Sequence, residues 1–308
     1  MLKVLSGVDF KVNKGEKVGL IGEAGCGKTT TMKSIMRILP QNASVPHGEI
    51  LFKGKDLLKI DKKELQRIRR KEISMVFQDP TAALNPVFKI KDQLFDIIRY
   101  GGTYEEGRNP SKEEITAEAI RVLKDVALPD PERILENYPF QLSGGMRQRI
   151  CIAMSLVAAN DLLIADEPGT SLDVTIEDQI LRLLGSLAVG KNLSVILISH
   201  ALGAVRGLVD RVYVMYAGHM IEVAPTEELF SNPIHPYTQG LLRAIPKLTG
   251  GGILEGITGR IPNYLNPPEG CRFYPRCDSS DPNCENVKPE LFDVGKDHQV
   301  ACVRYGRK

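Results

Sequence analysis

Short apolar runs recur along the chain, separated by longer stretches in which apolar residues return at helical spacing. The runs at Lys17–Gly22, Ile73–Phe77, Leu162–Ala165 and Ser194–Ile198 are four to six residues long and almost free of charge. Runs of this length and composition predict buried strands of a parallel sheet. A further strand is predicted at Glu49–Lys53.

The stretches between these runs predict helices. One helix is expected from about Lys28 to Ile38 and another over Ile176–Leu187. From about Pro86 to Tyr138 the pattern becomes helical and more charged, which predicts an amphipathic helical insert. Its clearest apolar face is formed by Ile115, Ala119, Val122, Leu123 and Val126. The alternation of strand and helix predicts an α/β fold.

Composition narrows the class of protein. The chain has 308 residues, of which 43% are hydrophobic and 25% charged, values that are ordinary for a soluble globular protein of about two domains. A net charge of +2 argues against nucleic-acid binding and against a polybasic membrane anchor. No apolar run reaches the roughly 18 residues of a membrane span, and the N-terminus has no signal-peptide core. A cytosolic protein is expected.

A phosphate-binding loop is predicted directly after the first strand. The segment GEAGCGKT, residues 22–29, matches G-x-x-x-x-G-K-[ST] at every fixed position and lies between a predicted strand and a predicted helix. Inward-turned backbone N–H groups would hold phosphate, Lys28 would reach the β- and γ-phosphates, and Thr29 would bind Mg²⁺. The alternative is a chance glycine turn. The predicted ATP-binding residues are Gly22, Glu23, Ala24, Gly25, Cys26, Gly27, Lys28, Thr29 and Thr30, with Cys26 interpreted as space-filling.

Two adjacent acids, Asp166 and Glu167, end the predicted strand Leu162–Ala165. Asp166 fits the residue that holds Mg²⁺ in phosphoryl-transfer enzymes, directly or through water. Glu167 fits a general base for the attacking water. The alternative is a pair of solvated acids that begin a loop.

Four further segments accompany the phosphate loop and the acids, in a fixed order. These are Gln78 after the strand ISMVF, the run Leu142–Gly145 (LSGG), the triplet Ser171-Leu172-Asp173, and His200 after the strand SVILIS. In this order and over most of the chain, the set resembles the ATP-binding subunits of ABC transporters. The resemblance implies a P-loop NTPase core with a RecA-like parallel sheet, a helical subdomain and a small C-terminal cysteine-bearing extension.

The resemblance also implies how such a chain works. Two ATPase subunits would form a head-to-tail sandwich, with each ATP between the phosphate loop of one subunit and the LSGG segment of the other. Ser143, Gly144 and Gly145 would face the partner's γ-phosphate at the start of a helix, and Asp173 would belong to the nucleotide-binding set. Within one site, His200 would approach the γ-phosphate and Gln78 would act at Mg²⁺ and the water. Taken alone, Gln78 also fits a polar strand cap and His200 a packed core histidine.

The branch of the family is indicated by Met146 after the LSGG segment, by Phe77–Pro80 and by Asn232–Thr238 (NPIHPYT). These segments resemble the first ATPase subunit of dipeptide or oligopeptide importers. Importers of nickel or oligosaccharides remain alternatives within the branch. The expected domains are an ATPase core at 1–85 and 150–230, a helical subdomain at 86–149 and an extension at 231–308. Family members usually stack an aromatic residue on adenine, and none precedes Phe10.

Four of the six cysteines lie near the C-terminus, at Cys271, Cys277, Cys284 and Cys302. Four cysteines in a reducing compartment indicate a metal site before they indicate disulfides. The resemblance favours a [4Fe-4S] cluster, and Zn²⁺ and free or oxidised thiols remain alternatives. The role would be structural, because a tail of this size is too small to be stable by burial alone.

The resemblance implies further partners and a location. The partners would be a second ATPase subunit, two transmembrane permease subunits and an extracytoplasmic solute-binding protein, with no nucleic acid. The chain would act at the cytoplasmic face of the cell membrane, with ATP and Mg²⁺ as cofactors. The competing functions are an exporter motor and a soluble ABC-type ATPase that acts on nucleic acid or ribosomes.

Overall fold

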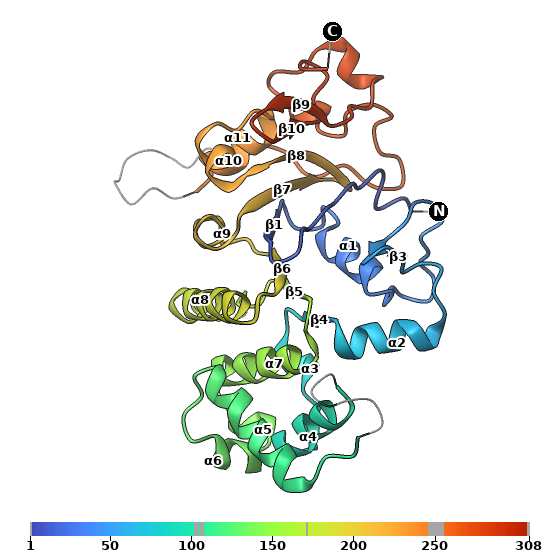
Figure 1. Ribbon diagram of the computed structural model, residues 1–308. Coiled ribbons are helices and arrows are strands. Elements are labelled where there is room, and N and C mark those ends of the chain that lie inside the picture. Colours follow the sequence, from blue (N-terminus) through green and yellow to red (C-terminus); the bar gives the residue numbers. More distant parts are fainter. Residues whose placement is uncertain (1, 102–103, 105–107, 171, 246–255, 307–308) are drawn as a thin grey trace. The chain divides into compact units, whose positions relative to one another are not determined.

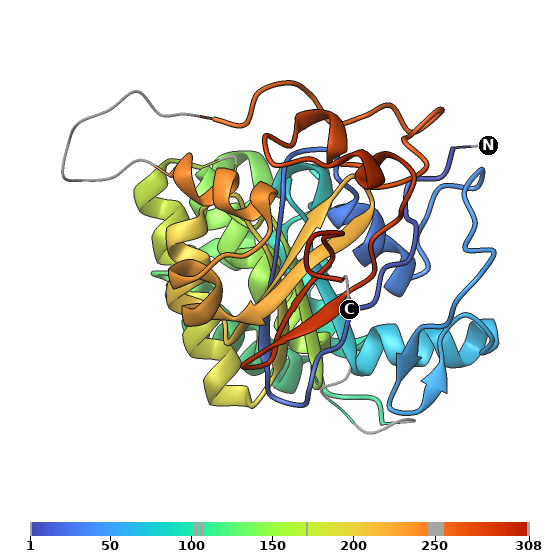
Figure 2. The ribbon, with the colours of Figure 1, turned by 90° about the horizontal axis from the view of Figure 1, so that it is seen from above.

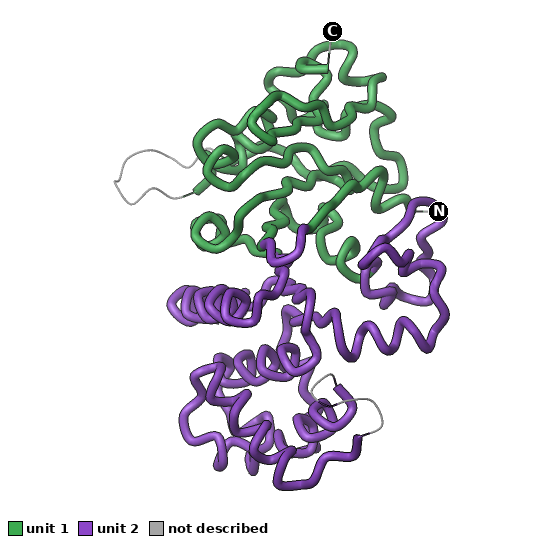
Figure 3. The backbone as a smooth tube through the Cα atoms, viewed as in Figure 1, with its two compact units in different colours: residues 1–12, 17–33, 198–308 green, residues 13–16, 34–197 purple. Residues whose placement is uncertain are grey.

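The computed structural model describes residues 2–101, 104, 108–170, 172–245 and 256–306. The chain divides into two compact units, coloured separately in Figure 3. Unit 1 contains residues 1–12, 17–33 and 198–308, and unit 2 contains residues 13–16 and 34–197. Ser171, part of the predicted Ser171-Leu172-Asp173 triplet, lies outside the described residues.

The strands of unit 1 form a sheet in the order β1, β7, β8, β10, β9. Their bounds are β1 Lys17–Ile21, β7 Arg211–Tyr216, β8 His219–Pro225, β9 Phe292–Gly295 and β10 His298–Val300. β1 pairs with β7 in parallel, whereas β8 and β10 run antiparallel to their neighbours. In Figure 2 the C-terminal strand β10, in red, lies along β8, in orange. The C-terminal tail therefore adds strands to the sheet that carries the phosphate loop.

The helices of unit 1 are short. They are α9 Leu202–Leu208, α10 Thr226–Ser231, α11 Pro236–Arg243 and the 3₁₀ turns η2 Tyr274–Arg276 and η3 Pro282–Glu285. Helix α1, Lys28–Ile35, begins in unit 1 and ends in unit 2. It is shorter than the predicted Lys28–Ile38, because Arg37 has a left-handed backbone (φ +50°) that a helix does not continue through.

The strands of unit 2 include the two that carry the candidate catalytic acids and glutamine. β4, Ile73–Val76, pairs in parallel with β5, Leu162–Asp166, and β6, Ser194–Ile198, lies on the other side of β5. Every residue of β5 and β6 is buried, as the apolar runs predict. The predicted strand at Glu49–Lys53 is shorter, since only β2, Leu51–Phe52, forms, and it pairs with β3, Lys55–Asp56.

The helices of unit 2 include α4, α5 and α6, which lie within the predicted amphipathic insert and are green in Figure 1. Their bounds are α2 Lys62–Lys71, α3 Pro80–Ala83, α4 Ile90–Tyr100, α5 Lys112–Asp125, α6 Pro131–Glu136, the 3₁₀ turn η1 Pro139–Gln141, α7 Gly144–Ala158 and α8 Val174–Lys191. In α5 the hydroxyl of Ser111 accepts from the amide of Glu114, whose carboxylate accepts from the amide of Ser111. This capping box begins the helix, whose predicted apolar face is buried. No helix in the described part of the chain is long and apolar enough to cross a membrane.

A buried carboxylate joins the tail to the sheet of unit 1. Glu222 on β8 is fully buried and accepts hydrogen bonds from the backbone N–H groups of Ile234 (2.6 Å) and His235 (3.1 Å). Its Oε1 also lies 2.7 Å from Nε2 of His298 on β10. Because a buried carboxylate is costly without such partners, this cluster fixes the NPIHPYT segment and β10 against β8.

We expect the free energy of unfolding of the protein to fall in mild acid, because His235 in this cluster is buried in its neutral form. His235 is buried and its Nδ1 accepts a hydrogen bond from the backbone N–H of Tyr237 at 3.0 Å. Burial lowers its pKa from 6.5 to about 4, although the charge of Glu222 acts in the opposite direction. Between these two values the unfolded chain binds more protons than the folded chain, so the free energy of unfolding falls as the pH drops from about 6.5 to about 4. The loss reaches about 3 kcal/mol and is absent above pH 6.5.

Denaturant unfolding as a function of pH measures this loss. The matched variant is His235→Asn, whose amide oxygen also accepts a hydrogen bond but does not titrate. His219, whose pKa burial lowers to about 3, adds to the same loss in both proteins. The variant is therefore expected to lose less stability between pH 6.5 and 4 than the wild type. An identical pH dependence in the two proteins would exclude His235 as a source of it.

Candidate functional site

The phosphate loop follows β1 in unit 1 and leads into α1 (Figure 1). At its first position Gly22 has φ +150°, and a Cβ there would lie 2.2 Å from the carbonyl oxygen of Met215 on β7. Only glycine fits so close to the backbone of a neighbouring strand. The glycine after the strand therefore allows the loop to turn tightly at the edge of the sheet.

The ammonium group of Lys28 lies inside the phosphate loop. Its side chain is buried, and Nζ donates to the carbonyl oxygens of Gly22 at 2.7 Å and Glu23 at 3.0 Å. Thr29 and Thr30 follow in the first turn of α1 and are half-buried. The loop thus brings together a fixed positive charge, two hydroxyl groups and the N-terminus of a helix, the groups that bind phosphate and Mg²⁺ in P-loop proteins.

The rest of the loop divides into exposed and buried positions. Ala24 and Gly25 are exposed, whereas Cys26 is fully buried. Burial raises the pKa of the Cys26 thiol, partly offset by the charge of Lys28. A protonated, inaccessible thiol is not a nucleophile, which agrees with the interpretation of Cys26 as space-filling.

The candidate acids and Gln78 meet at one edge of the sheet of unit 2. β4 and β5 are parallel, so the residues that follow their carboxyl ends lie together. Gln78 follows β4, and its Nε2 donates to Oε2 of Glu167 at 3.0 Å. Asp166 and Glu167 are both largely buried. Gln78 and Glu167, predicted to act on the same water, are therefore in direct contact.

The carboxylate of Glu167 is held from two sides. Besides Gln78, the hydroxyl of Thr170 donates to Oε2 at 3.3 Å. The backbone of Glu167 has φ +50°, a left-handed conformation that costs a non-glycine residue about 1–2 kcal/mol. Backbone strain of this kind is concentrated at functional sites. The strain and the two hydrogen bonds orient one carboxylate oxygen at the end of β5.

The LSGG segment forms the start of α7. Ser143 is the N-cap residue, exposed, and its hydroxyl accepts from the backbone N–H of Met146 at 3.3 Å. A Cβ at Gly144 would lie 3.0 Å from Leu172, and one at Gly145 would lie 3.1 Å from Ile176. The two glycines therefore permit close packing of α7 against the start of α8.

Asp173, before α8, and His200, after β6, are both exposed. Asp173 is the N-cap of α8, and its carboxylate accepts from the backbone N–H of Ile176 at 3.0 Å. His200 lies two residues after the end of β6, and its carbonyl oxygen accepts from the N–H of Leu202. His200 is exposed, so it is not the packed core histidine of the alternative interpretation. His200 and the phosphate loop belong to unit 1, whereas Gln78, Glu167 and the LSGG segment belong to unit 2.

The four tail cysteines are free thiols in unit 1. The backbone N–H of Cys271 donates to the carbonyl oxygen of Cys284 at 2.8 Å. Burial raises the pKa of Cys271 to about 11, and the charges of Cys284 and Cys302 act in the same direction. Burial and the same two cysteines also raise the pKa of Cys277. Cys284 and Cys302 therefore influence both Cys271 and Cys277.

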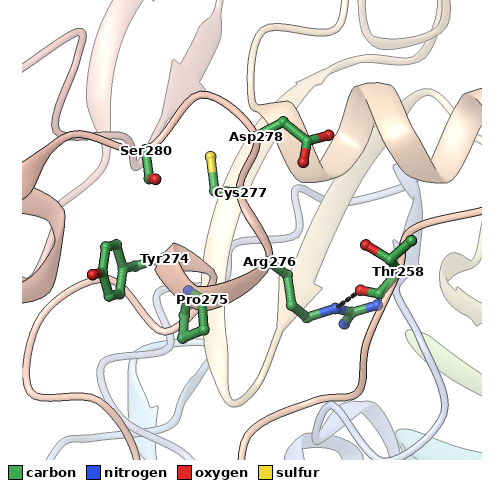
Figure 4. Close-up of a pocket in the computed structure, with 7 residues that line it drawn as sticks. All are labelled: Thr258, Tyr274, Pro275, Arg276, Cys277, Asp278 and Ser280. Atoms are coloured by element: carbon green, nitrogen blue, oxygen red, sulfur yellow. Dashed lines mark hydrogen bonds between the residues drawn. The ribbon is translucent and has the colours of Figure 1, made fainter.

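These positions do not support the metal prediction. Among residues 2–101, 104, 108–170, 172–245 and 256–306, no group of three or more His, Cys, Asp or Glu side chains is placed to hold a metal ion. The pocket in Figure 4 lies beside this tail, with Arg276 and Cys277 in its lining.

Sequence reasoning missed three side chains that contact the phosphate loop within unit 1. These are Tyr237 on α11, Tyr264 in the tail and Arg276 in η2. Arg276 directly precedes Cys277 in the sequence, and no sequence pattern connects it with residues 22–29. No sequence signal identifies these contacts, because they join positions more than 200 residues apart.

Comparisons with known proteins identify the family of the chain. Residues 5–170 match the family model described as ABC transporter, and residues 221–284 match the model for the C-terminal region of oligopeptide/dipeptide transporters. A dipeptide transport ATP-binding protein of Bacillus subtilis (strain 168) is 45% identical over 304 residues, which cover 98% of this chain and 89% of that protein. An oligopeptide transport ATP-binding protein of the same organism is 41% identical over 306 residues, 99% of this chain and 92% of that protein.

A solved structure extends the likeness to three dimensions. A dimeric ATP-binding cassette in a post-hydrolysis state, bound to ADP and Pi, has a TM-score of 0.62 and 26% identity, with 72% of this chain and 90% of that chain covered. Fold and site together define an ATP-hydrolysing cassette, a mixed α/β fold with a large, mostly parallel sheet. The chain belongs to the ABC transporter family of ATP-binding proteins, which confirms the family prediction.

Proposed function

We propose that the chain is the ATP-hydrolysing motor subunit of an importer for dipeptides or oligopeptides. The observation that carries this proposal is the presence, in one chain, of an ABC cassette and the C-terminal region of oligopeptide/dipeptide transporters. The relatives that are 41–45% identical are named for dipeptide or oligopeptide transport. The C-terminal match favours peptides over nickel or oligosaccharides, and favours an importer over an ATPase that acts on nucleic acid or ribosomes.

The roles proposed for the site residues follow from their positions. Lys28 and N–H groups of the loop from Gly22 to Thr30 bind the phosphates of ATP, except the N–H of Glu23, which donates to the hydroxyl of Tyr237. Thr29 and Asp166 supply a hydroxyl and a carboxylate oxygen, the type of donor that Mg²⁺ prefers, and the ion when bound neutralises phosphate charge. Glu167 accepts a proton from the attacking water, which Gln78 helps to orient. His200 contributes a donor toward the γ-phosphate.

The LSGG segment is proposed to complete the site of a second ATPase subunit. Ser143, Gly144 and Gly145 begin α7, a 15-residue helix with its positive end at these residues. Ser143 is exposed, and Gly144 and Gly145 are half-buried. The exposed Asp173, N-cap of α8, is proposed to contact the partner's nucleotide site near the same surface. An anion presented by a partner subunit is the ligand that this helix start is suited to bind.

The remaining proposals concern organisation and partners. The core at 1–85 and 150–230 binds and hydrolyses ATP, and the helical subdomain at 86–149 carries the LSGG segment. The extension at 231–308 packs on the core of its own subunit. The partners are a second ATPase subunit, two transmembrane permease subunits and an extracytoplasmic solute-binding protein. Binding to the permeases would hold the chain at the cytoplasmic face of the membrane.

Affinity purification of the tagged full chain from detergent-solubilised native membranes tests this assignment. Two polytopic subunits, a second ATPase and a solute-binding protein are expected to copurify and to be identified by mass spectrometry. Glu132→Gln changes an exposed position of α6 and serves as the control for the purification. The same partners are expected to copurify with this variant. Recovery in the soluble fraction with ribosomal or nucleic-acid partners would contradict the transport assignment.

For the tail, we propose that Cys271, Cys277, Cys284 and Cys302 bind a [4Fe-4S] cluster, with Zn²⁺ as the alternative. What supports this is that the four thiols are free of disulfides and belong to one unit, and that the backbone N–H of Cys271 donates to the carbonyl oxygen of Cys284 at 2.8 Å. A cluster binds one thiolate at each of four iron atoms, so its ligands are spaced more widely than those of a single zinc ion. Zinc ligands tend to follow C-x₂₋₄-C, and the spacings Cys271-x₅-Cys277 and Cys277-x₆-Cys284 are wider, which favours the cluster over zinc.

Metal analysis after anaerobic purification decides between the alternatives. About four iron atoms and four acid-labile sulfides per chain are expected for one [4Fe-4S] cluster, with the content lost in Cys284→Ser. Cys151→Ser, which changes a buried cysteine of α7 in unit 2, is the matched control and is expected to retain the iron. A wild-type chain without iron or zinc would refute the proposal.

A further inference from the structure

Three side chains of the C-terminal half contact the phosphate loop within unit 1. The hydroxyl of Tyr237 accepts from the backbone N–H of Glu23 at 2.9 Å, and the hydroxyl of Tyr264 donates to the carbonyl oxygen of Gly25 at 2.8 Å. The guanidinium of Arg276 makes two hydrogen bonds to the carboxylate of Glu23, at 2.8 and 3.0 Å. The loop that is to bind phosphate is therefore held from outside by the tail.

The pair formed by Glu23 and Arg276 is the strongest of these contacts. Two parallel N–H···O bonds between an arginine and a carboxylate fix both distance and orientation. The side chain of Arg276 is 6% exposed and that of Glu23 is 28% exposed, so water competes little for the arginine. An ion pair in this environment is screened much less than one on the surface.

Arg276 is itself held rigidly by its own surroundings. Its Nε donates to the carbonyl oxygen of Thr258 at 2.8 Å, the contact drawn in Figure 4. Its guanidinium also donates to the hydroxyl of Tyr216 at 3.3 Å and to the carbonyl oxygen of Ile257 at 3.3 Å. Because its donors have fixed acceptors on several sides, the arginine offers Glu23 a preset position rather than a mobile charge.

We infer that Arg276 is a positioning residue for ATP binding, which acts through Glu23 by holding the phosphate loop in its binding conformation. The loop contains three glycines with positive φ, Gly22, Gly25 and Gly27, and glycine backbone has many other conformations available. A protein whose binding-competent form is only partly populated binds its ligand more weakly in proportion to that population. Release of Glu23 is therefore expected to weaken ATP binding without a change in any group that touches ATP.

The inference also gives the cysteine tail a role at the ATP site. Arg276 ends the turn η2 between Cys271 and Cys277, which is closed by N–H···O bonds from Tyr274 to Cys271 and from Cys277 to Tyr274. The position of the arginine thus depends on the fold of this turn. Correct folding of the tail is thereby linked to the conformation of a loop about 250 residues earlier in the chain.

A double-mutant cycle on the full chain tests the inference. The variants are Arg276→Met, Glu23→Gln and the two combined, and the readouts are the dissociation constant of Mg²⁺-ATP by equilibrium titration, kcat, KM and thermal unfolding. Each single change is expected to raise the dissociation constant and KM about 10-fold, the effect of losing one charge-assisted contact, with kcat at saturating ATP nearly unchanged. The combined variant is expected to be no weaker than either single one, because both remove the same contact.

Two further variants separate positioning from general stability. Arg276→Lys retains the charge but not the two parallel bonds, so an intermediate dissociation constant is expected. Arg260→Met, at an exposed arginine of the same tail, is expected to bind ATP as the wild type does. If Arg276→Met does not fold, Glu23→Gln decides alone, since it leaves the arginine and its other contacts in place.

Wild-type ATP affinity in a folded Arg276→Met or Glu23→Gln variant would overturn the inference. Effects that simply add in the combined variant would also overturn it. Because the inference rests on ATP binding by the loop, the wild type is measured first. Binding by the wild type together with unchanged binding by the variants would remove the positioning role and leave the ATPase assignment intact.

Discussion

Replacement of Glu167 by glutamine is expected to lower ATP turnover about 10²- to 10⁴-fold while ATP binding persists. Glutamine has nearly the same shape, so it can still pack at the end of β5 beside Gln78 and Thr170. It cannot accept a proton from the attacking water, because its amide is not basic. The loss therefore falls on the chemical step, and the ATP-bound dimer is expected to accumulate.

Steady-state phosphate release measures the loss, and equilibrium titration measures the binding that remains. Size-exclusion chromatography in the presence of Mg²⁺-ATP reports the accumulated dimer. Glu132→Gln, the same chemical change at an exposed position of α6, is expected to turn over at the wild-type rate. Wild-type turnover by Glu167→Gln would contradict the assignment of the general base.

Replacement of Lys28 by methionine is expected to weaken ATP binding roughly 10- to 100-fold, as the loss of charge-assisted hydrogen bonds to phosphate implies. Methionine fills a similar volume in this buried position but brings no charge and no donor. In the structure the ammonium is held by the carbonyl oxygens of Gly22 and Glu23, at the centre of the loop. Turnover is expected to fall as well, since the same charge stabilises the transferring phosphoryl group.

The matched control is Lys33→Met, which removes a lysine from the last turn of the same helix. Its dissociation constant for ATP is expected to equal that of the wild type, as determined by equilibrium titration of a fluorescent ATP analogue. Thermal unfolding of both variants monitors their folding. Equal affinity of Lys28→Met and the wild type would mean that the loop does not bind phosphate through this lysine.

Elements with a strong local pattern could be predicted from the sequence. The strands predicted at Ile73–Phe77, Leu162–Ala165 and Ser194–Ile198 correspond to β4, β5 and β6 within one residue at each end. β5 and β6 are buried along their whole length and β4 along most of it, so nearly every position is apolar and the runs are easily recognised. The predicted helix Ile176–Leu187 lies inside α8, Val174–Lys191, which begins two residues earlier because Asp173 caps it.

Elements that depend on distant pairing could not be predicted. β9 and β10 contain only four and three residues, and β10 is a strand because it pairs with β8, about 75 positions earlier in the chain. So short a segment has no periodicity of its own. The end of α1 was also missed, since a left-handed residue at Arg37 has no signature when it is not glycine or asparagine.

Some residues of the candidate site could likewise be predicted from a local pattern, and others could not. The phosphate loop and the acids after β5 have fixed spacings set by the chemistry of phosphate and Mg²⁺, so the residues alone identify them. The contact between Glu23 and Arg276 joins positions 253 residues apart through a fold that no local pattern describes. The four-cysteine site stays a prediction, because the spacing of the cysteines alone does not determine whether a metal binds.

Uptake of labelled peptides is the most direct test of the central claim that ATP hydrolysis by this chain drives peptide import. Cells of the organism of origin that lack the chain are complemented with the wild type, with Glu167→Gln or with Glu132→Gln. The account predicts that uptake of labelled di- and tetrapeptides is restored by the wild type and by Glu132→Gln, and that Glu167→Gln restores none. Peptide uptake that is the same with and without the chain, or that Glu167→Gln restores in full, would contradict the claim.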